Sequence, residues 1–289
     1  MPTSRVIVCH GKSALLEHEG TIIACVLKGR SGRPVCGDLV EYQAPENEQP
    51  RINKVGERNN TLIRADFRKR GRIIASNIDQ LVMVVAATPE PDWGQVIRGI
   101  VIARLCNISS LLLVNKTDLA GSTAYQEIEG IFSYLGCETL YCSATDDVGI
   151  DAVVEALTGR HSVLVGQSGV GKSTLSNRIL PDREIRIGAI SEATGFGRHT
   201  TTETTWYPLP NDAGAIIDSP GMRDFAIWDM PKDELLAVFS ELAALAHNCR
   251  FNNCIHTAEP DCAVKAAVES GAIPQLWYQT WVDALTPSE

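Results

Sequence analysis

The sequence has no apolar run of about 18 residues or more, so a transmembrane helix of ordinary length is excluded. Its first residues, MPTSRVIVCHGK, lack the charged, apolar and small-residue succession of a secretory signal peptide. Internal repeats and low-complexity segments are also absent. We therefore expect a cytoplasmic protein with no membrane partner.

The sequence also has no excess of basic residues. It carries 26 Lys and Arg against 35 Asp and Glu, a formal net charge of −9. This balance argues against a protein that coats nucleic acid with its whole surface. One local segment is basic, RADFRKRGR at Arg64–Arg72. It is either a solvated turn or a nucleic-acid contact.

A disulfide framework is a third feature that is missing. The nine cysteines are an odd number, and most are scattered along the chain. Cys9, Cys25, Cys106 and Cys142 lie in or beside apolar runs. We expect buried, reduced thiols at these four positions.

The rhythm of apolar residues divides the chain into three parts. A length of 289 residues with 44% hydrophobic content can bury real cores. Residues 1–70 contain the short strand-like runs RVIVCH, GTIIACVL, GDLVEYQ, PRINKV and TLIRAD, which favour an OB-type β-barrel. In residues 71–228, apolar strands alternate with helical stretches near 94–106, 124–135 and 149–158, which indicates an α/β domain. Residues 229–289 are mostly helical, with stretches expected at 263–270 and 274–285.

The segment GQSGVGKS fits the phosphate-loop pattern and lies between an apolar strand and a helix. Its backbone N–H groups and the helix N-terminus favour phosphate binding. Lys172 is expected to reach the outer phosphates, and Ser173 to hold Mg²⁺. The predicted nucleotide-binding residues here are Gly166, Gln167, Ser168, Gly169, Val170, Gly171, Lys172, Ser173 and Thr174.

The segment IIDSPG supplies a second phosphate-side motif. Asp218 is expected to reach Mg²⁺ through water, and the Gly221 N–H to reach the γ-phosphate. Between the two motifs lies ISEATGFGRHTTTETT, a polar loop that we expect nucleotide to close. Thr201 is the predicted loop ligand of Mg²⁺, although a plain surface loop is the alternative.

The segment LLLVNKTD predicts a guanine-reading loop at the end of an apolar strand. Asp118 can accept both guanine N–H hydrogens in a bidentate, charge-assisted pair. Asn115 is expected to bridge the base and neighbouring loops, and the Lys116 stem to lie along the ring. YCSA ends the next strand, so the backbone N–H groups of Ser143 and Ala144 are expected to face the guanine carbonyl.

These parts form a complete GTPase in an unusual order. The base loop comes first, followed by the phosphate loop, the threonine loop and DSPG. A circular permutation explains this order with no missing part, because the termini of a domain often lie close together.

A Cys/His cluster follows, with Cys249, Cys254, His256 and Cys262 spaced C-x4-C-x-H-x5-C. Three thiolates and one imidazole can form a closed, structural zinc site. The spacing also leaves reduced core cysteines open. The polar neighbours Arg250 and Asn252 argue against an apolar core here.

The residue that orients the attacking water is not in its common place. Many GTPases have Gln directly after the DxxG glycine, but this chain has Met222. His199, beside the threonines, is the candidate for catalysis, because its side chain can exchange protons near neutral pH. A solvent-exposed loop histidine is the alternative. Arg198 can contact phosphate or rRNA.

The motifs NKTD, GQSGVGKST, RHTTT and DSPGMRDF, in this order, resemble the ribosome-small-subunit-dependent GTPase A (RsgA) family. The resemblance covers nearly the whole chain and extends to SNIDQLVMV. It implies an OB barrel at 1–70, a circularly permuted GTPase domain at 71–228 and a zinc domain at 229–289. The implied cofactors are one structural Zn²⁺ on the Cys/His cluster and Mg²⁺ with GTP. The RHTTT histidine, His199 here, is the family's proposed catalytic residue.

The same resemblance implies slow GTP hydrolysis to GDP, stimulated by the small (30S) ribosomal subunit. The implied role is late maturation of that subunit near its decoding centre, with 16S rRNA as a partner. We expect a monomer whose subunit binding depends on the bound nucleotide. Two alternatives stay open: a P-loop kinase or ATPase with an accidental NKTD, and a non-enzymatic RNA-binding module.

Overall fold

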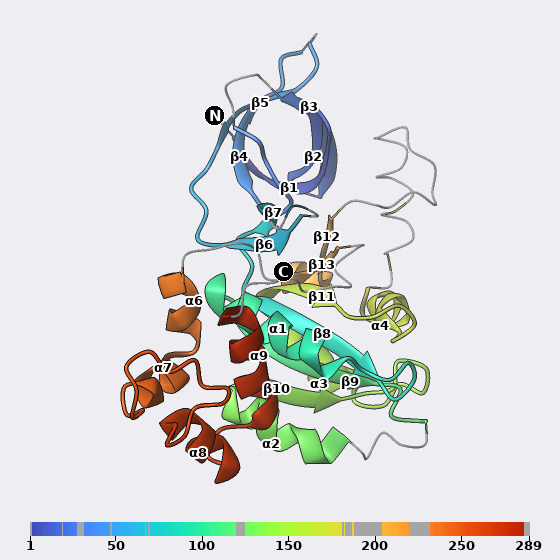
Figure 1. The fold of residues 1–289 in the computed structure, drawn as a ribbon. Coiled ribbons are helices and arrows are strands. Elements are labelled where there is room, and N and C mark those ends of the chain that lie inside the picture. Colours follow the sequence, from blue (N-terminus) through green and yellow to red (C-terminus); the bar gives the residue numbers. More distant parts are fainter. Residues whose placement is uncertain are drawn as a thin grey trace.

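The structure, a computed structural model, consists of an N-terminal barrel, a central α/β layer and a group of C-terminal helices (Figure 1). It describes residues 2–18, 20–27, 32–46, 48–66, 68, 70–119, 125–180, 182, 187, 204–219 and 232–285. The barrel lies at one end of the α/β layer. The C-terminal helices lie beside the helical face of that layer.

Five strands close the N-terminal barrel, with β1 hydrogen-bonded to β2 on one side and to β4 on the other. Its own core contains Val6, Leu16, Val40 and Ile52, all fully buried. The five-stranded barrel was predicted, but its strands are β1 (Thr3–His10), β2 (Ser13–His18), β3 (Thr21–Leu27), β4 (Leu39–Gln43) and β5 (Arg51–Val55). Sequence reasoning missed β2.

The predicted fifth barrel strand, TLIRAD, is instead β6 (Thr61–Ala65), which pairs with β7 (Gly71–Ser76) in a separate two-stranded sheet. The basic segment therefore lies at a hairpin. Its turn is closed by Asp66, whose carboxylate accepts hydrogen bonds from the guanidinium of Arg70 at 2.8 and 3.0 Å.

A buried carboxylate ties this hairpin to the barrel. Asp38 is fully buried and pairs through both oxygens with the Arg58 guanidinium, at 2.7 and 2.8 Å. The Ser76 hydroxyl donates a third hydrogen bond to the same carboxylate at 2.6 Å. Paired and hydrogen-bonded in this way, a buried charge can be tolerated.

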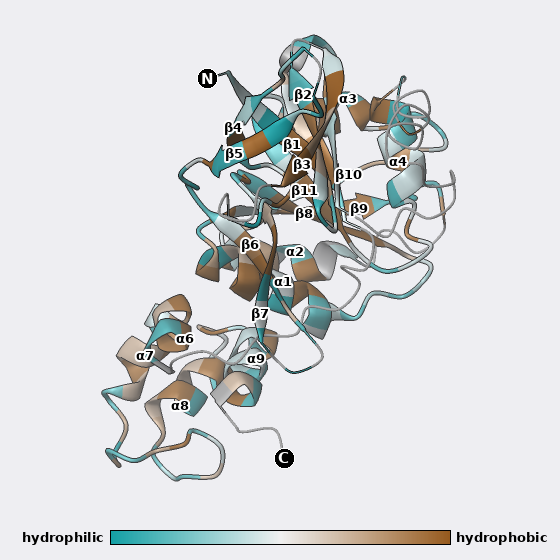
Figure 2. Cartoon of the chain, turned by 90° about the horizontal axis from the view of Figure 1, so that it is seen from above, coloured by the Kyte–Doolittle hydropathy of each residue, from teal (hydrophilic) through white to brown (hydrophobic). Residues whose placement is uncertain are grey.

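The central sheet has five parallel strands in the order β10-β9-β8-β11-β13. Its middle strand is buried along its whole length, as expected of a parallel sheet covered on both faces. The apolar centre of the sheet is visible from above (Figure 2). These strands are β8 (Gln80–Ala86), β9 (Ser109–Asn115), β10 (Glu138–Tyr141), β11 (Arg160–Val165) and β13 (Gly214–Asp218).

The helical stretches expected in this layer are all present. They are α1 (Trp93–Leu105), α2 (Gln126–Tyr134), α3 (Ile150–Leu157) and α4 (Lys172–Ile179). The predicted hairpin through NDAG is formed by β12 (Thr205–Pro208) and β13, joined at η2 (Pro210–Asp212).

The barrel and the central layer share one continuous sheet, because β12 also pairs with β1. The Trp206 ring on β12 contacts the side chains of Arg5 and His161 at this junction. The Arg5 guanidinium is 4.4 Å from its centroid, and the His161 ring is 4.6 Å away. Asp79 accepts from His161 Nδ1 at 2.9 Å. The junction therefore joins residues from β1, β11 and β12.

The C-terminal helices form a lobe that packs on α1 (Figure 2). The apolar periodicity of KDELLAVFSELAALAHNC continues through two helices, which are separated at Phe239. The helices are α6 (Lys232–Val238), α7 (Ser240–Ala246), α8 (Ala263–Glu269) and α9 (Gln275–Leu285). Within the described chain, no helix has the length and apolar character needed to cross a membrane. The exact domain limits at 70/71 and 228/229 stay predictions.

Candidate functional site

The phosphate loop connects β11 to α4, as its motif predicts. Gly171 is the last residue before α4 and has φ +95°. A Cβ atom there would lie 2.4 Å from Asn115 Nδ2, so the loop needs glycine at this position. Lys172 Nζ donates to the carbonyls of Gly166 and Gln167 at 2.6 and 2.7 Å. Ser173 and Thr174 are exposed in the first turn of α4.

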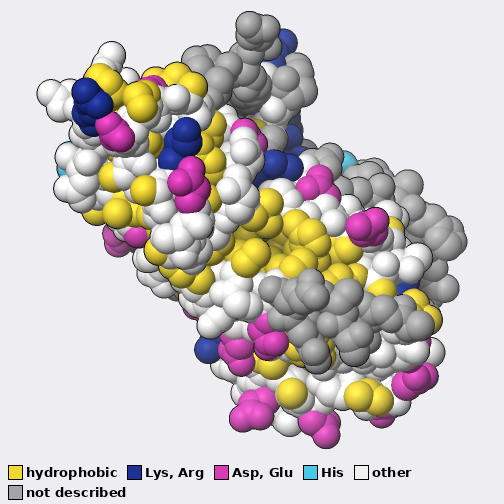
Figure 3. All heavy atoms as spheres, turned by 60° about the horizontal axis from the view of Figure 1, so that its bottom comes forward, with side chains coloured by type: hydrophobic (Ala, Val, Ile, Leu, Met, Phe, Trp, Pro, Cys, Tyr) yellow, Lys and Arg dark blue, Asp and Glu magenta, His cyan; other side chains and the backbone are white. Residues whose placement is uncertain are grey.

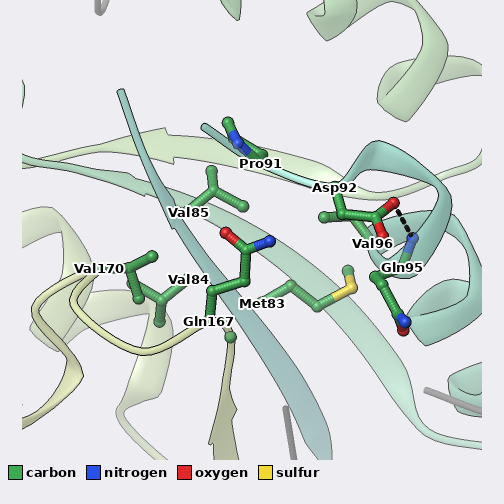
Figure 4. A pocket seen from close by; sticks show the side chains of 10 residues that line it. Met83, Val84, Val85, Pro91, Asp92, Gln95, Val96, Gln167 and Val170 are labelled. Carbon is green, nitrogen blue, oxygen red and sulfur yellow. Dashed lines mark hydrogen bonds between the residues drawn. The ribbon is translucent and has the colours of Figure 1, made fainter. Parts of the chain in front are cut away.

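The Gln167 side chain lines a pocket instead of lying exposed at the surface of the loop. It lies in a small pocket between β8 and the start of α1, near Val84, Val85 and Val96 (Figure 4). Its Oε1 is buried and has no hydrogen-bond partner among the described residues. Any contact of Gln167 with phosphate in this conformation therefore comes from its backbone.

Asn115, buried at the end of β9, joins the base loop to the phosphate loop. Its Nδ2 donates to the Val170 carbonyl at 2.9 Å, and its Oδ1 accepts from the Ala144 N–H at 3.1 Å. The Cys142 thiol also donates to Oδ1 at 3.4 Å. Burial raises the pKa of Cys142 to about 12, so the thiol stays protonated and can donate near neutral pH. The three loops are thus held together by one amide.

Asp118 and Ser143 meet at the same edge of the sheet. The Ser143 hydroxyl donates to Asp118 Oδ1 at 2.6 Å, which orients the predicted guanine-reading carboxylate. Lys116 Nζ donates to the Thr88 carbonyl at 3.0 Å, after β8. The carboxyl ends of β8, β9 and β11 therefore converge, as ligand sites in open α/β sheets do.

The two backbone N–H groups predicted to face guanine have partners within the chain. The Ser143 N–H donates to the Val148 carbonyl at 2.9 Å, and the Ala144 N–H to Asn115 Oδ1. Binding of the base by these N–H groups stays a prediction. It requires the Ala144 N–H either to leave Asn115 Oδ1 or to donate to Oδ1 and to the base at the same time.

Asp218 is the last residue of β13 and lies in register with Leu164 of β11. This places it beside the strand that leads into the phosphate loop. One residue further, the Ser219 hydroxyl is 3.1 Å from the Thr204 hydroxyl, so the starts of β12 and of the DSPG segment are in contact. The phosphate loop and Asp218 are therefore brought to one edge. Arg198, His199, Thr201, Gly221 and Met222 lie outside the described residues.

The predicted metal ligands are brought together in the C-terminal lobe. Ligand atoms of Cys249, Cys254, His256 and Cys262 all lie within 4.8 Å of one another. The Sγ atoms of Cys249 and Cys262 are 3.8 Å apart, and His256 Nδ1 is 3.5 and 3.4 Å from them. Tetrahedral zinc with Zn–S of about 2.3 Å and Zn–N of about 2.05 Å separates S from S by about 3.8 Å and S from N by about 3.5 Å. The donor set and its spacing fit structural zinc.

The arrangement of His256 depends on α9. The Tyr278 hydroxyl donates to the His256 carbonyl at 2.6 Å, and the Trp281 ring lies 4.8 Å from the imidazole. The Cys262 Sγ also accepts from the Lys265 N–H at 3.5 Å, at the start of α8. The cluster therefore connects α8 and α9 to the loop that follows α7.

Together, the fold and the convergent loops define a P-loop nucleotide-binding domain of the GTPase class, with its motifs in circularly permuted order. The RsgA GTPase family model matches residues 55–228. The chain belongs to the RsgA GTPase family and is a GTPase.

Known relatives match over nearly the whole chain. A protein of Actinobacillus pleuropneumoniae serotype 5b, named small ribosomal subunit biogenesis GTPase RsgA, is 34% identical over 96% of this chain and 82% of its own length. One of the same name from Paraburkholderia phytofirmans is 37% identical over 93% of this chain and 87% of its own length.

Solved structures show the same architecture. The crystal structure of YjeQ from Thermotoga maritima has a TM-score of 0.73 and 29% identity, covering 98% of this chain and 96% of that one. YloQ, described as a circularly permuted GTPase, has a TM-score of 0.70 at 24% identity, covering 100% of this chain and 97% of that one. The second likeness supports the fold alone.

Several features of the site were not foreseen from the sequence. They are the Ser143 hydroxyl on Asp118, the Cys142 thiol on Asn115 and the Gln167 side chain behind the loop. Only YCSA gave a signal, because it ends the strand beside NKTD. Which of its atoms meets which partner depends on the register of β9 and β10.

Proposed function

We propose that this GTPase binds the small ribosomal subunit, acts in its late maturation and hydrolyses GTP faster when bound to it. The junction of guanine loop and phosphate loop through Asn115 supports the GTPase part of the proposal, and the relatives carry its ribosomal part. The relatives that match over nearly the whole chain are named for small-subunit biogenesis. We also propose contact with 16S rRNA and action in the cytoplasm, because the small subunit is the proposed binding partner. We further propose a monomer with domains at 1–70, 71–228 and 229–289.

In this proposal, the base is read by Asp118, held by Ser143, and by the Lys116 stem. Phosphates lie along the backbone N–H groups of the loop that ends at Gly171. Lys172 exchanges the two loop carbonyls it now contacts for phosphate oxygens, a gain because a charged acceptor makes a stronger hydrogen bond. Ser173 and Thr201 would hold Mg²⁺, which would neutralise charge on the phosphates.

His199 is the proposed catalytic residue, orienting the attacking water from a loop whose position depends on the subunit. The reasoning is chemical: Met222 follows the DxxG glycine, and its thioether is at best a weak acceptor. An imidazole can accept a proton or orient water near neutral pH. Gly221 is the proposed donor to the γ-phosphate.

The permuted order gives nucleotide state a route to both flanking domains. Residue 204 leads into β12, which pairs with β1 of the barrel. Residue 219 precedes the segment that joins the C-terminal lobe. The Thr204–Ser219 contact lies between these two routes. We propose that GTP and GDP change subunit binding through these two connections.

Structural zinc on the Cys/His cluster is the proposed cofactor of the C-terminal lobe. When bound, it cross-links the loop after α7 to the start of α8. This chain's own residues then hold the site rigid, with Tyr278 fixing the His256 carbonyl and Trp281 covering the ring.

One experiment tests the proposal. GTP and ATP turnover would be measured with and without purified small subunits, for the wild type and His199→Ala. We expect small subunits to raise the turnover of GTP but not that of ATP. The His199→Ala variant should still bind subunits but lose most of this increase. Turnover that does not respond to subunits contradicts the proposal. Equal use of ATP would instead favour a general P-loop ATPase.

A further inference from the structure

The loop that carries the metal ligands also presents unusually exposed apolar side chains. Ile255 is 69% exposed, more than any other large apolar residue among those described, and Phe251 is 40% exposed. A single exposed apolar side chain is ordinary on a protein surface. Two exposed apolar side chains on one short loop, close to the metal ligands, instead indicate a site of interaction.

The loop is held in one shape by internal contacts. Glu259 accepts the Ile255 N–H at 2.7 Å and the N–H groups of Thr257 and Ala258 at 3.1 Å. Cys254 and His256, on either side of Ile255, direct their ligand atoms into the cluster. Ile255 is therefore displayed outward on a rigid frame, so it loses little conformational entropy when a partner covers it.

The charged side chains of the loop are engaged within it. Arg250 pairs with Asp261 at 2.7 Å, and its guanidinium lies 5.4 Å from the Phe251 ring centroid. Glu259 is occupied by backbone N–H groups. What the loop offers a partner is consequently its apolar tip, Ile255 and Phe251, and we call this pair the loop tip.

The charge of the lobe argues against RNA as the partner of the loop tip. Residues 232–285 contain seven acidic residues and three basic ones, a difference of −4. A site for RNA needs Lys and Arg near the phosphates, and residues 249–262 carry one basic residue, Arg250, against two acidic ones, Glu259 and Asp261. Apolar, acidic and basic side chains are all visible on the underside of the molecule (Figure 3).

We propose that the loop tip docks on a basic protein surface of the small subunit, with Ile255 entering an apolar pocket and the acidic lobe facing positive charge. This inference rests on the proposed function, since it names the partner of the C-terminal lobe. Rim charges that complement one another steer association, and a central apolar anchor supplies affinity.

The test compares Ile255→Asn with Val154→Asn in the full-length, zinc-loaded protein. Val154 is a matched control, because it is 37% exposed on α3, outside the C-terminal lobe. Neither change alters charge. Affinity would be measured for small subunits and for protein-free 16S rRNA. We expect Ile255→Asn to weaken subunit binding about tenfold, as loss of a central anchor does, without changing rRNA binding or zinc content. Val154→Asn should change neither affinity.

A cross-link identifies the class of partner directly. A photo-reactive phenylalanine analogue would replace Ile255, and the product formed on small subunits would be treated with ribonuclease or protease. We expect a product that ribonuclease leaves intact and that contains a subunit protein with a basic surface.

A cross-link to rRNA, or an equal loss of rRNA affinity in Ile255→Asn, would overturn the proposal in favour of a nucleobase partner. Unchanged subunit binding in Ile255→Asn would overturn docking by the loop tip. Failure of the proposed function is distinguishable, because then the wild-type protein itself shows neither subunit binding nor stimulated GTP turnover.

Discussion

Asn115 contacts two segments that are distant from it in sequence. Its amide reaches Val170 in the phosphate loop, Ala144 after β10 and the thiol of Cys142. A side chain added at Gly171 would clash with the same Asn115 amide. The loop proposed to read the base and the loop proposed to hold phosphate are therefore joined through one amide, and we expect substitutions in either loop to affect both.

Asp118→Asn should change which base the protein prefers. The charge-assisted bidentate pair with guanine is lost, which costs about 1.5–3 kcal/mol, or roughly a 10- to 100-fold loss of GTP affinity. Xanthine has a carbonyl where guanine has its exocyclic amine, and the new amide can donate to it. Titration calorimetry should show tighter xanthosine triphosphate binding. Asp146→Asn, exposed on the neighbouring loop, is the control. An unchanged preference for GTP would exclude Asp118 as the reader.

Gly171→Ala should abolish nucleotide binding and destabilise the fold. The new Cβ meets Asn115 Nδ2 at 2.4 Å and sits at φ +95°. Strain of this kind costs about 1–3 kcal/mol, and relieving it displaces the base loop. Gly136→Ala is the matched control, because it has φ +68° and no atom within 4 Å of the added Cβ. Thermal melts and GTP titration would measure both effects. Equal behaviour of the two variants would show that the contact has no role.

Much of the site was predictable at the scale of residues, because the information lies in short sequence motifs. Asn115, Asp118 and Lys172 lie in motifs whose residue types fit one chemistry. The partners that orient them do not follow from spacing, because the Ser143 hydroxyl reaches Asp118 only through the pairing of β9 with β10. Gln167 is the sharpest case: its place in the motif suggests phosphate, and its side chain packs behind the loop.

At the scale of elements, strands were harder to assign than helices. Helix periodicity is a local signal, and α1 to α4 lie where it indicates them. Barrel membership depends on which strands pair across long separations. β2 was missed, and β6 was placed in the barrel although it pairs with β7. The break at Phe239 between α6 and α7 was likewise invisible, because apolar spacing continues through it.

The junction of β1, β11 and β12 predicts a pH dependence of stability. Burial, followed by the nearby Arg5 charge, lowers the pKa of His161, while Asp79 opposes this shift. The unfolded chain then takes up a proton at higher pH than the folded one. The contribution of neutral His161 to the free energy of unfolding is therefore fully present above about pH 6.5. It is lost as pH falls through the pKa of His161 in the folded protein.

His161→Phe should flatten this dependence, because phenylalanine keeps the ring contact with Trp206 but cannot titrate. His247→Gln, at an exposed histidine of the C-terminal lobe, is the control. Urea denaturation at several pH values between about 5 and 7.5 would measure the free energy of unfolding across the window of histidine titration. A wild-type slope retained in His161→Phe would assign the dependence to another group.

Chelation of zinc should unfold the packing of α8 and α9 and leave the GTPase domain bound to nucleotide. The ligands join the loop after α7 to α8, and Trp281 packs on His256. Near-ultraviolet circular dichroism should lose the signal of the buried tryptophans, and metal analysis should give one zinc per chain. Cys254→Ser should behave as the chelated protein. A chain that folds identically without metal would show reduced thiols instead.

At the scale of the whole molecule, Arg104 fastens the C-terminal lobe to the GTPase domain. From the end of α1 it donates to the Leu135 carbonyl at 2.9 Å and to the Val238 carbonyl at 3.1 Å. Its guanidinium lies 4.8 Å from the Trp277 centroid and 3.6 Å from Glu241. The planar, multiply donating guanidinium suits all these contacts at once, which an ammonium does not.

The lobe follows the DSPG segment in the chain. Its attachment through Arg104 should therefore affect how the proposed nucleotide-dependent change at DSPG reaches the lobe. Arg104→Lys keeps the charge but cannot make the same set of contacts, and we expect the lobe to loosen. The lobe should then unfold before the GTPase domain, giving two transitions where the wild type gives one. Hydrogen exchange in α7 and α9 should rise in the same variant, while exchange in β8 and β9 stays unchanged.

Arg178→Lys is the matched control for this last prediction. Arg178 also pairs with a carboxylate, Asp147, but both side chains are about half exposed, at 50% and 52%. Exposed pairs contribute only about 0–1 kcal/mol, so this variant should melt as the wild type does. If Arg104→Lys also melted in one wild-type transition, Arg104 would not hold the lobe. The packing of α1 against α6 and α9 would then be the fastening to test next.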